Sequence, residues 1–135
     1  MIIRSYEINK LNFDKNKLIL FYGKNEGLKN ETINNLLNNR EAITKYEEKE
    51  ILENTNTFLE NIFSKSLFEN EKIIIIKRVT DKILKVLEEI EEKNIDDIKI
   101  ILNADILEKK SKLRSFFEKS KKYICVPVYQ DTTQT

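Results

Sequence analysis

Four consecutive isoleucines at residues 73–76 constrain the fold of this chain more than any other feature. Successive side chains of a β-strand point to opposite faces of a sheet, so an unbroken β-branched run places apolar side chains on both faces. Both faces must then be buried, as is usual for strands of parallel sheets that are covered by helices. We therefore predict that residues 73–79 form a buried strand, the third of the chain.

Strand and helix patterns alternate along the rest of the sequence. Apolar or alternating runs predict four further strands, at residues 17–22, 42–46, 98–102 and 123–126. Apolar residues at helical spacing predict helices at residues 26–39, 57–65 and 83–90. Thr80 or Asp81 is expected to cap the third of these helices, and Ser111 to open a fourth. Five short strands that alternate with helices predict an α/β fold, with a mainly parallel sheet covered on both faces.

Length and composition suit one globular domain. The chain of 135 residues allows a single core and leaves little room for a second, so residues 1–135 are expected to form one domain. Hydrophobic residues make up 40% and charged residues 35%, a balance typical of folded chains. The 24 basic and 23 acidic residues are mixed along the chain, and the net charge of +1 indicates no general affinity for nucleic acid or membranes.

Several kinds of active site are excluded by the residue types that are missing. There is no histidine, which removes the usual general base and the commonest metal ligand, and with them any Ser-His-Asp or Cys-His centre. The single cysteine, Cys125, excludes an internal disulfide and a cysteine-based zinc site. We expect no metal and no cofactor. No apolar segment is long enough for a signal peptide or a transmembrane helix, so the expected location is cytoplasmic.

A glycine-containing turn follows the first predicted strand, where a phosphate-binding loop would lie. Such a loop needs the pattern G-x-x-x-x-G-K-[ST], because its amides cradle the phosphates, its lysine neutralises them and its hydroxyl holds magnesium. Here Gly23 and Gly27 are one residue too close, with Lys24 between them, and no Lys-Ser or Lys-Thr pair follows. Glu26 would also repel a phosphate. We interpret the segment as a degenerate phosphate loop that makes a tight strand-to-helix turn.

The ends of two later strands bear on the same interpretation. A hydrolase of this topology keeps acidic residues at the end of the third strand, for magnesium and water, whereas this chain has Lys77 and Arg78 there. Asn103 follows the fourth strand, where related hydrolases sense the γ-phosphate, but without a phosphate loop we expect it to serve a turn or a cap. Hydrolysis is therefore not expected. The alternative is a divergent P-loop NTPase that uses Lys24 or Lys29 on phosphate.

An adjacent apolar pair, Leu67 and Phe68, falls in the turn before the isoleucine strand, with polar residues on both sides. One interpretation is that the pair packs between the preceding helix and the core. The other is that it is exposed and inserts into an apolar pocket of a partner. The residue pattern leaves both open.

A basic cluster surrounds the helix that Ser111 opens. It is either a solvated helix face or a contact for the backbone of a nucleic acid. Acidic residues at positions 108 and 118 lower the net positive charge of this cluster. Its members are Lys109, Lys110, Lys112, Arg114, Lys119, Lys121 and Lys122.

Three segments carry a resemblance to a known family. In order, they are GKNEGLKNE, FLENIFSKSLFENEKIIIIKR and IKIILNADILEKKSKLRSFFEKSKKYICVPVY. The most specific parts are SLF followed by a charged turn and an apolar strand, and the pattern AD-x-L-x-K-x-S-K-L-x-x-x-F. Together they resemble the N-terminal domain of the delta subunit of bacterial DNA polymerase III, a clamp-loader subunit. The resemblance covers essentially the whole chain and is nearest to alphaproteobacterial members.

This resemblance implies both a fold and a function. The fold would be an AAA+-like, RecA/P-loop-type three-layer domain, with strand order 5-1-4-3-2, that has lost its nucleotide site. The function would be to bind the ring-shaped β sliding clamp and help open it during DNA replication, without hydrolysing nucleotide. The parent complex is a DNA-directed DNA polymerase, and this chain would be an excised part of a longer subunit.

Site residues and partners also follow from the resemblance. The family contacts the clamp through a Leu-Phe pair at the tip of the turn before the third strand, which corresponds here to Leu67 and Phe68, flanked by Ser66 and Glu69. Many clamp-binding peptides follow Q-x-x-L-F, and Ser64 stands in the Gln position. Other clamp-loader subunits would bind through regions mostly absent from this sequence. The basic cluster, rather than the resemblance, suggests one further partner, primer-template DNA, with Lys109, Lys110, Lys112 and Arg114 as the candidate contacts.

Overall fold

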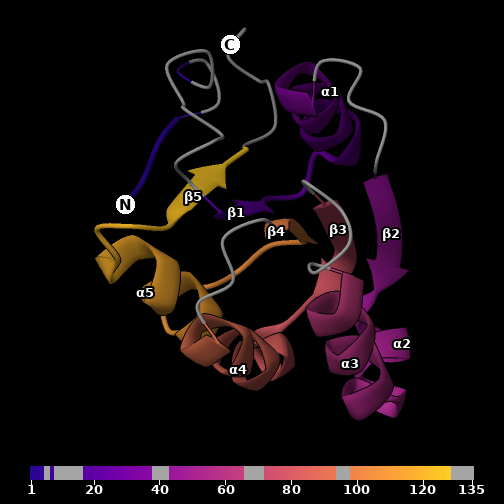
Figure 1. The fold of residues 1–135 in the computed structure, drawn as a ribbon. Coiled ribbons are helices and arrows are strands. Elements are labelled where there is room, and N and C mark those ends of the chain that lie inside the picture. Colours follow the sequence, from indigo (N-terminus) through magenta and orange to yellow (C-terminus); the bar gives the residue numbers. More distant parts are fainter. Residues whose placement is uncertain (5–6, 8–16, 38–42, 66–71, 94–97, 129–135) are drawn as a thin grey trace, which may run out of the picture.

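The computed structural model describes residues 1–4, 7, 17–37, 43–65, 72–93 and 98–128, and it shows a central sheet between two layers of helices (Figure 1). The strands are β1 (Leu18–Tyr22), β2 (Ile43–Glu47), β3 (Lys72–Val79), β4 (Ile98–Ala104) and β5 (Ile124–Pro127). The helices are α1 (Glu26–Leu37), α2 (Glu48–Glu53), α3 (Thr55–Lys65), α4 (Leu84–Lys93) and α5 (Lys112–Lys119), with a 3-10 turn, η2 (Asp81–Ile83), before α4. None of the described helices is long and apolar enough to span a membrane.

All neighbouring strands of the sheet are parallel, and their order is β2-β3-β4-β1-β5. This is the predicted order 5-1-4-3-2 read from the other side, so the predicted α/β sheet is confirmed. The register aligns apolar residues across the strands, with Ile76 opposite Leu102 and Leu102 opposite Leu20. Since the strands run in one direction, their carboxyl ends share one edge of the sheet, which we call the carboxyl edge.

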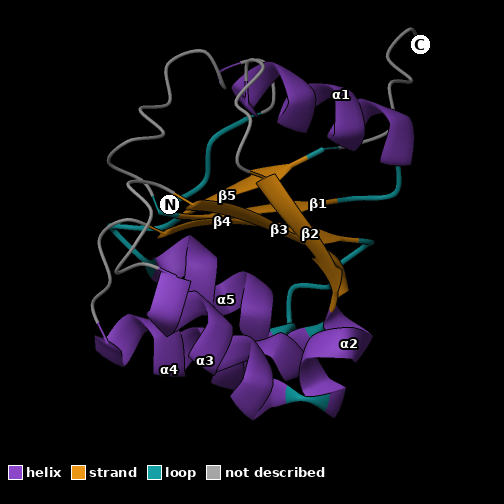
Figure 2. Cartoon of the chain, turned by 45° about the vertical axis from the view of Figure 1, so that its right-hand side comes forward, coloured by secondary structure: helices purple, strands orange, loops and turns teal. Residues whose placement is uncertain are grey.

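Helices cover both faces of the sheet, as the isoleucine run predicts. Figure 2 shows α1 alone on one face and α2–α5 on the other. Ile74 and Ile76 are fully buried in the larger core cluster, together with side chains of α2–α5. Ile73 and Ile75 are buried in a second cluster that includes side chains of α1. Alternate isoleucines therefore anchor opposite layers.

Helix α2 is the one helix of the described chain that the sequence patterns did not predict. It has six residues and a single buried apolar side chain, Ile51, so it carries no helical periodicity. Its buried residue Glu48 explains its position. The two carboxylate oxygens of Glu48 accept hydrogen bonds from the Thr80 amide, at 2.6 Å, and from the Thr80 hydroxyl, at 2.8 Å. The helix therefore holds the end of β3 in place.

The first residues of the chain extend the sheet beyond β5, which was also not predicted. Ile2 pairs with Cys125 in a parallel bridge, and Ile3 donates its amide to the Cys125 carbonyl at 3.0 Å. The Met1 ammonium donates to three carbonyl oxygens near the end of α5 and the start of β5, those of Phe117, Ser120 and Tyr123. These contacts attach the amino terminus to both the sheet and α5.

Both predicted helix starts are confirmed, and one carboxylate connects them. The Thr80 hydroxyl caps η2 by accepting the Lys82 amide at 3.2 Å, and Ser111 caps α5. Asp81 accepts the Ser111 hydroxyl at 2.6 Å. It also accepts the first two amides of α5, each at 3.1 Å. These hydrogen bonds lower the pKa of the Asp81 carboxyl below its usual value, and the bond from Ser111 has the largest effect.

Replacing Asp81 with Asn should lower the free energy of unfolding at pH 7 by about 1 kcal/mol, since solvent screens this largely exposed carboxylate and the main loss is a helix-capping interaction. Because the folded-state pKa lies below the unfolded one, the stabilisation is present above the unfolded pKa and is lost as the pH falls through the folded pKa. Urea unfolding of both proteins between pH 7 and pH 2 measures the difference. Asp105→Asn is the control, and a pH-independent difference would contradict the expectation.

Candidate functional site

Gly23, the first glycine of the predicted degenerate phosphate loop, is required by a close backbone contact. Its φ is +135°, and an added Cβ would lie 2.0 Å from the carbonyl oxygen of Val128. The Gly23 amide donates to the Asp105 carbonyl at 3.2 Å, and the Val128 amide donates to Tyr22 at 2.8 Å. The segment after β5 therefore packs on this glycine, and the Gly23 amide is engaged within the fold.

Gly27, the second glycine, lies in the first turn of α1 and has no such contact. A Cβ there would meet only the Asn25 side-chain oxygen, at 3.7 Å. That oxygen accepts the Leu28 amide at 3.0 Å, so Asn25 caps α1. The two glycines thus make a capped strand-to-helix turn, as the sequence interpretation expected.

A buried lysine and an asparagine hold a carboxylate beside this turn. The Lys29 ammonium lies 3.0 Å from Glu26 Oε1, and it donates to the Ala104 carbonyl at 2.7 Å. The Asn103 side-chain amide donates to Glu26 Oε2 at 3.2 Å. Lys29 and Asn103 are 1% and 3% exposed. The prediction of a turn or cap for Asn103 was wrong, because Asn103 lies inside β4 and its side chain binds Glu26.

The end of β3 carries cations at the carboxyl edge. Lys77 and Arg78 are exposed, and Arg78 Nη1 donates to Glu47 Oε1 at 2.9 Å. Arg78 has a φ of +56° at an irregularity in the pairing of β3 with β4. Lys77 and Arg78 line a cleft of about 590 Å³. Lys24, Glu26, Lys29 and Asn103 line the same cleft. Within the described residues, no group of three acidic, Cys or His side chains suits a metal ion.

The four basic residues predicted to contact DNA differ in their exposure and in their contacts within the fold. Lys109, Lys110 and Lys112 are exposed between β4 and α5 and at the start of α5, and Lys110 lies 3.5 Å from exposed Glu108. Arg114 is mostly buried. Its guanidinium binds Glu118 Oε2 at 2.8 Å and the Leu107 carbonyl at 2.9 Å, and lies 5.2 Å from the centre of the Tyr22 ring.

The clamp-contact residues predicted from the resemblance, Ser66, Leu67, Phe68 and Glu69, lie outside the described residues. The described chain brackets them, since α3 ends at Lys65 and β3 begins at Lys72. The apolar stripe predicted for this helix is confirmed. It packs into the larger core cluster through Phe58, Leu59, Ile62 and Phe63.

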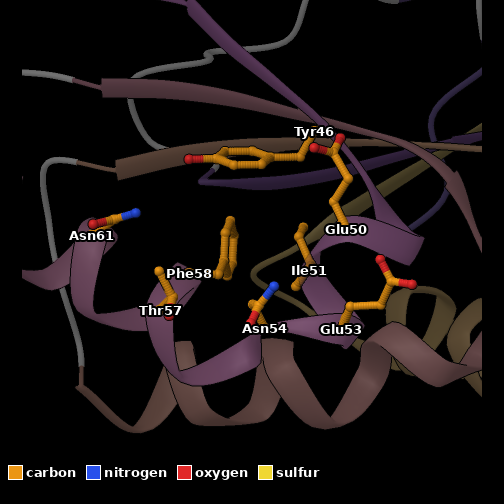
Figure 3. A pocket seen from close by; sticks show the side chains of 8 residues that line it. All are labelled: Tyr46, Glu50, Ile51, Glu53, Asn54, Thr57, Phe58 and Asn61. Carbon is orange, nitrogen blue, oxygen red and sulfur yellow. The ribbon is translucent and has the colours of Figure 1, made fainter.

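A second cleft, of about 290 Å³, lies between β2 and the helices α2 and α3 and was not predicted (Figure 3). The rings of Tyr46 and Phe58 meet edge to face, with centroids 4.9 Å apart. Figure 3 shows Asn61 beyond these rings at one end and Glu50 and Glu53 at the other. No sequence signal pointed to this cleft, because it depends on α2. Its polar side chains belong to successive turns of α2 and α3.

The single thiol is unsuited to nucleophilic chemistry. Cys125 is fully buried in β5, and burial raises its pKa to about 11. At neutral pH it is therefore protonated and shielded, and it serves as a packed residue of the core.

Replacing each glycine with alanine should separate their roles. Gly23→Ala should lower the free energy of unfolding by about 3 kcal/mol, because the new Cβ collides with the Val128 carbonyl at a φ that L-residues rarely adopt. Gly27→Ala should be neutral or stabilise by about 0.5 kcal/mol, since it only restricts the unfolded chain. Urea unfolding measures both, and equal stabilities would refute the close contact at Gly23.

One protein family matches the part of the chain that forms the sheet and the helices around it. The family model described as DNA polymerase III, delta subunit, matches residues 19–128, from β1 to just beyond β5. The chain matches no curated protein. The family match covers more than three quarters of the sequence and every strand of the sheet. The chain therefore belongs to the family of DNA polymerase III delta subunits, which are non-catalytic subunits of the clamp loader.

Proposed function

We propose that this domain binds the β sliding clamp and helps open the ring during DNA replication. The observation that carries the proposal is the family match over residues 19–128, which includes all five strands. The occupied Lys29 site supports the non-enzymatic part, because a phosphate would have to displace Glu26 from both of its partners. We also propose that residues 1–135 are one domain of a longer cytoplasmic subunit that assembles with other clamp-loader subunits.

Leu67 and Phe68 are the proposed contact with the clamp. Support comes from the sequence resemblance and from α3, whose apolar stripe already packs into the core through Phe58, Ile62 and Phe63. Insertion of the pair into an apolar pocket would contribute about 3–5 kcal/mol by the area of the two side chains. Ser66 and Glu69 flank the pair and are assigned no separate role.

Ring opening would follow from differential binding. A protein that binds the open or strained ring more tightly than the closed ring shifts the clamp towards the open form, and it shifts the equilibrium only by that difference in affinity. Nucleotide hydrolysis by this domain is not needed for that step.

The competing proposal is a divergent P-loop NTPase. It needs Lys24 or Lys29 on phosphate and acidic residues for magnesium. Lys29 is bound to Glu26 and to the Ala104 carbonyl. Of the acidic residues near the end of β3, Glu48 binds Thr80 and Glu47 binds Arg78. These contacts favour the non-enzymatic proposal.

The Leu67→Ala/Phe68→Ala double variant should lose clamp binding by more than about 100-fold, the loss that corresponds to about 3 kcal/mol. Binding is measured by titration, and by size exclusion, with the sliding clamp of the same organism. Ile106→Ala is the matched control, because Ile106 is an apolar side chain that is 62% exposed and lies just after the carboxyl end of β4. Circular dichroism checks the fold. Unfolding of the double variant, or unchanged binding, would defeat the proposal.

We propose a second contact, between primer-template DNA and the three exposed lysines Lys109, Lys110 and Lys112. Changing all three to Gln should weaken DNA binding and reduce the slope of log affinity against log salt by about 2–3, since each phosphate contact releases about one counterion. Arg114→Gln should instead lower stability, because its guanidinium is engaged within the fold. A triple variant with the parent's salt dependence would rule out this surface.

A further inference from the structure

The contact between Glu26, Lys29 and Asn103 has an unusual distribution of burial. The side chains that donate hydrogen bonds are buried, with the Lys29 side chain 2% exposed and Asn103 3% exposed. The side chain that accepts them, Glu26, is 60% exposed. The donors are thus part of the protein interior, whereas the carboxylate reaches them from the surface. Of the three groups, the carboxylate is the one that can be replaced without rebuilding the core.

The donors are held in position by the sheet and by α1, independently of the carboxylate. Lys29 lies on the buried face of α1 and its ammonium also donates to the Ala104 carbonyl at 2.7 Å. Asn103 lies in β4, opposite Phe21 of β1 and Lys77 of β3. Removal of the Glu26 carboxylate would therefore leave two fixed donors, one of them a buried cation. A buried cation that lacks an anionic partner is costly, so the position would favour an external anion.

The size of that anion is limited by the surrounding backbone. The Gly23 amide is bound to the Asp105 carbonyl, and the Lys29 amide to the Asn25 carbonyl. These amides cannot wrap around a chain of phosphates. Two side-chain donors suit two oxygens of one small group, such as a carboxylate or a single phosphate. The exposed cations Lys24 and Lys77 line the same cleft and favour negative charge there.

We propose that Lys29 and Asn103 form a latent binding site for a small oxyanion, which the chain's own Glu26 carboxylate occupies and closes. Glu26 acts as a tethered ligand, and its high local concentration excludes external anions. The proposal concerns the buried donors beside the turn after β1 and is independent of clamp binding.

The experiment uses Glu26→Ala in the full chain, with sodium formate and sodium phosphate as probes against sodium chloride of equal ionic strength. At about ten times the dissociation constant, mass action should raise the melting temperature of the variant by about 5 °C, and above the dissociation constant the rise should grow with the logarithm of the anion concentration. The parent and Glu31→Ala, which removes an exposed acid from the same helix, should show no such rise. ATP should give no larger rise than phosphate, since the site accepts one oxyanion.

The double variant Glu26→Ala/Lys29→Met identifies the site. It should be more stable in chloride than Glu26→Ala, because the unpaired buried cation is gone, and it should not respond to formate or phosphate. If Glu26→Ala does not fold in chloride, recovery of its circular dichroism in formate supports the proposal, and failure in every anion overturns it. An equal response of the parent, or no response of a folded Glu26→Ala, also overturns it.

Discussion

The side chains of β3 are buried on both faces of the sheet, and the positions of the other elements follow from this burial. Ile74 and Ile76 need the layer of α2–α5, and Ile73 and Ile75 need α1. A sheet covered on both faces is made of parallel strands joined by helices, so the loops after the strands meet at one edge. This is why Glu26, which follows β1, meets Asn103, which lies 77 residues further along the chain.

At the carboxyl edge the fold places a buried lysine beside the turn that follows β1. The turn after β1 and Asn103 at the end of β4 together hold the Glu26 carboxylate, which neutralises the buried Lys29 ammonium. Burial of a lone ammonium would destabilise the fold, so a chain that loses its anionic ligand must either remove the lysine or supply an anion. Here Glu26, one helical turn before Lys29, supplies it.

The strands of the sheet were predictable because they have strong local patterns, and their order followed from the family resemblance, whereas several contacts were not predictable. The isoleucines of β3 suit only a strand that is buried on both faces. Helix α2, in contrast, contains one buried apolar residue and is positioned by a long-range hydrogen bond that the Thr80 amide donates to Glu48. The glycine spacing predicted the tight turn between β1 and α1. The reason for Gly23 lies in Val128, more than 100 residues away, and no local pattern reveals that approach. Glu26 and Lys29, by contrast, are three residues apart on one helix, and this spacing is a local signal for their ion pair.

The two outer strands of the sheet are protected in different ways. Residues Met1–Ile3 run along β5 and use its free hydrogen-bonding groups, with Ile2 paired to Cys125. In the part of the chain that the structure describes, no strand pairs with the outer side of β2. An uncovered edge can recruit a strand from another molecule, and a lysine in the middle of an edge strand opposes this. Lys45 stands at the centre of β2 and is exposed, so self-association through this edge would have to bury its charge.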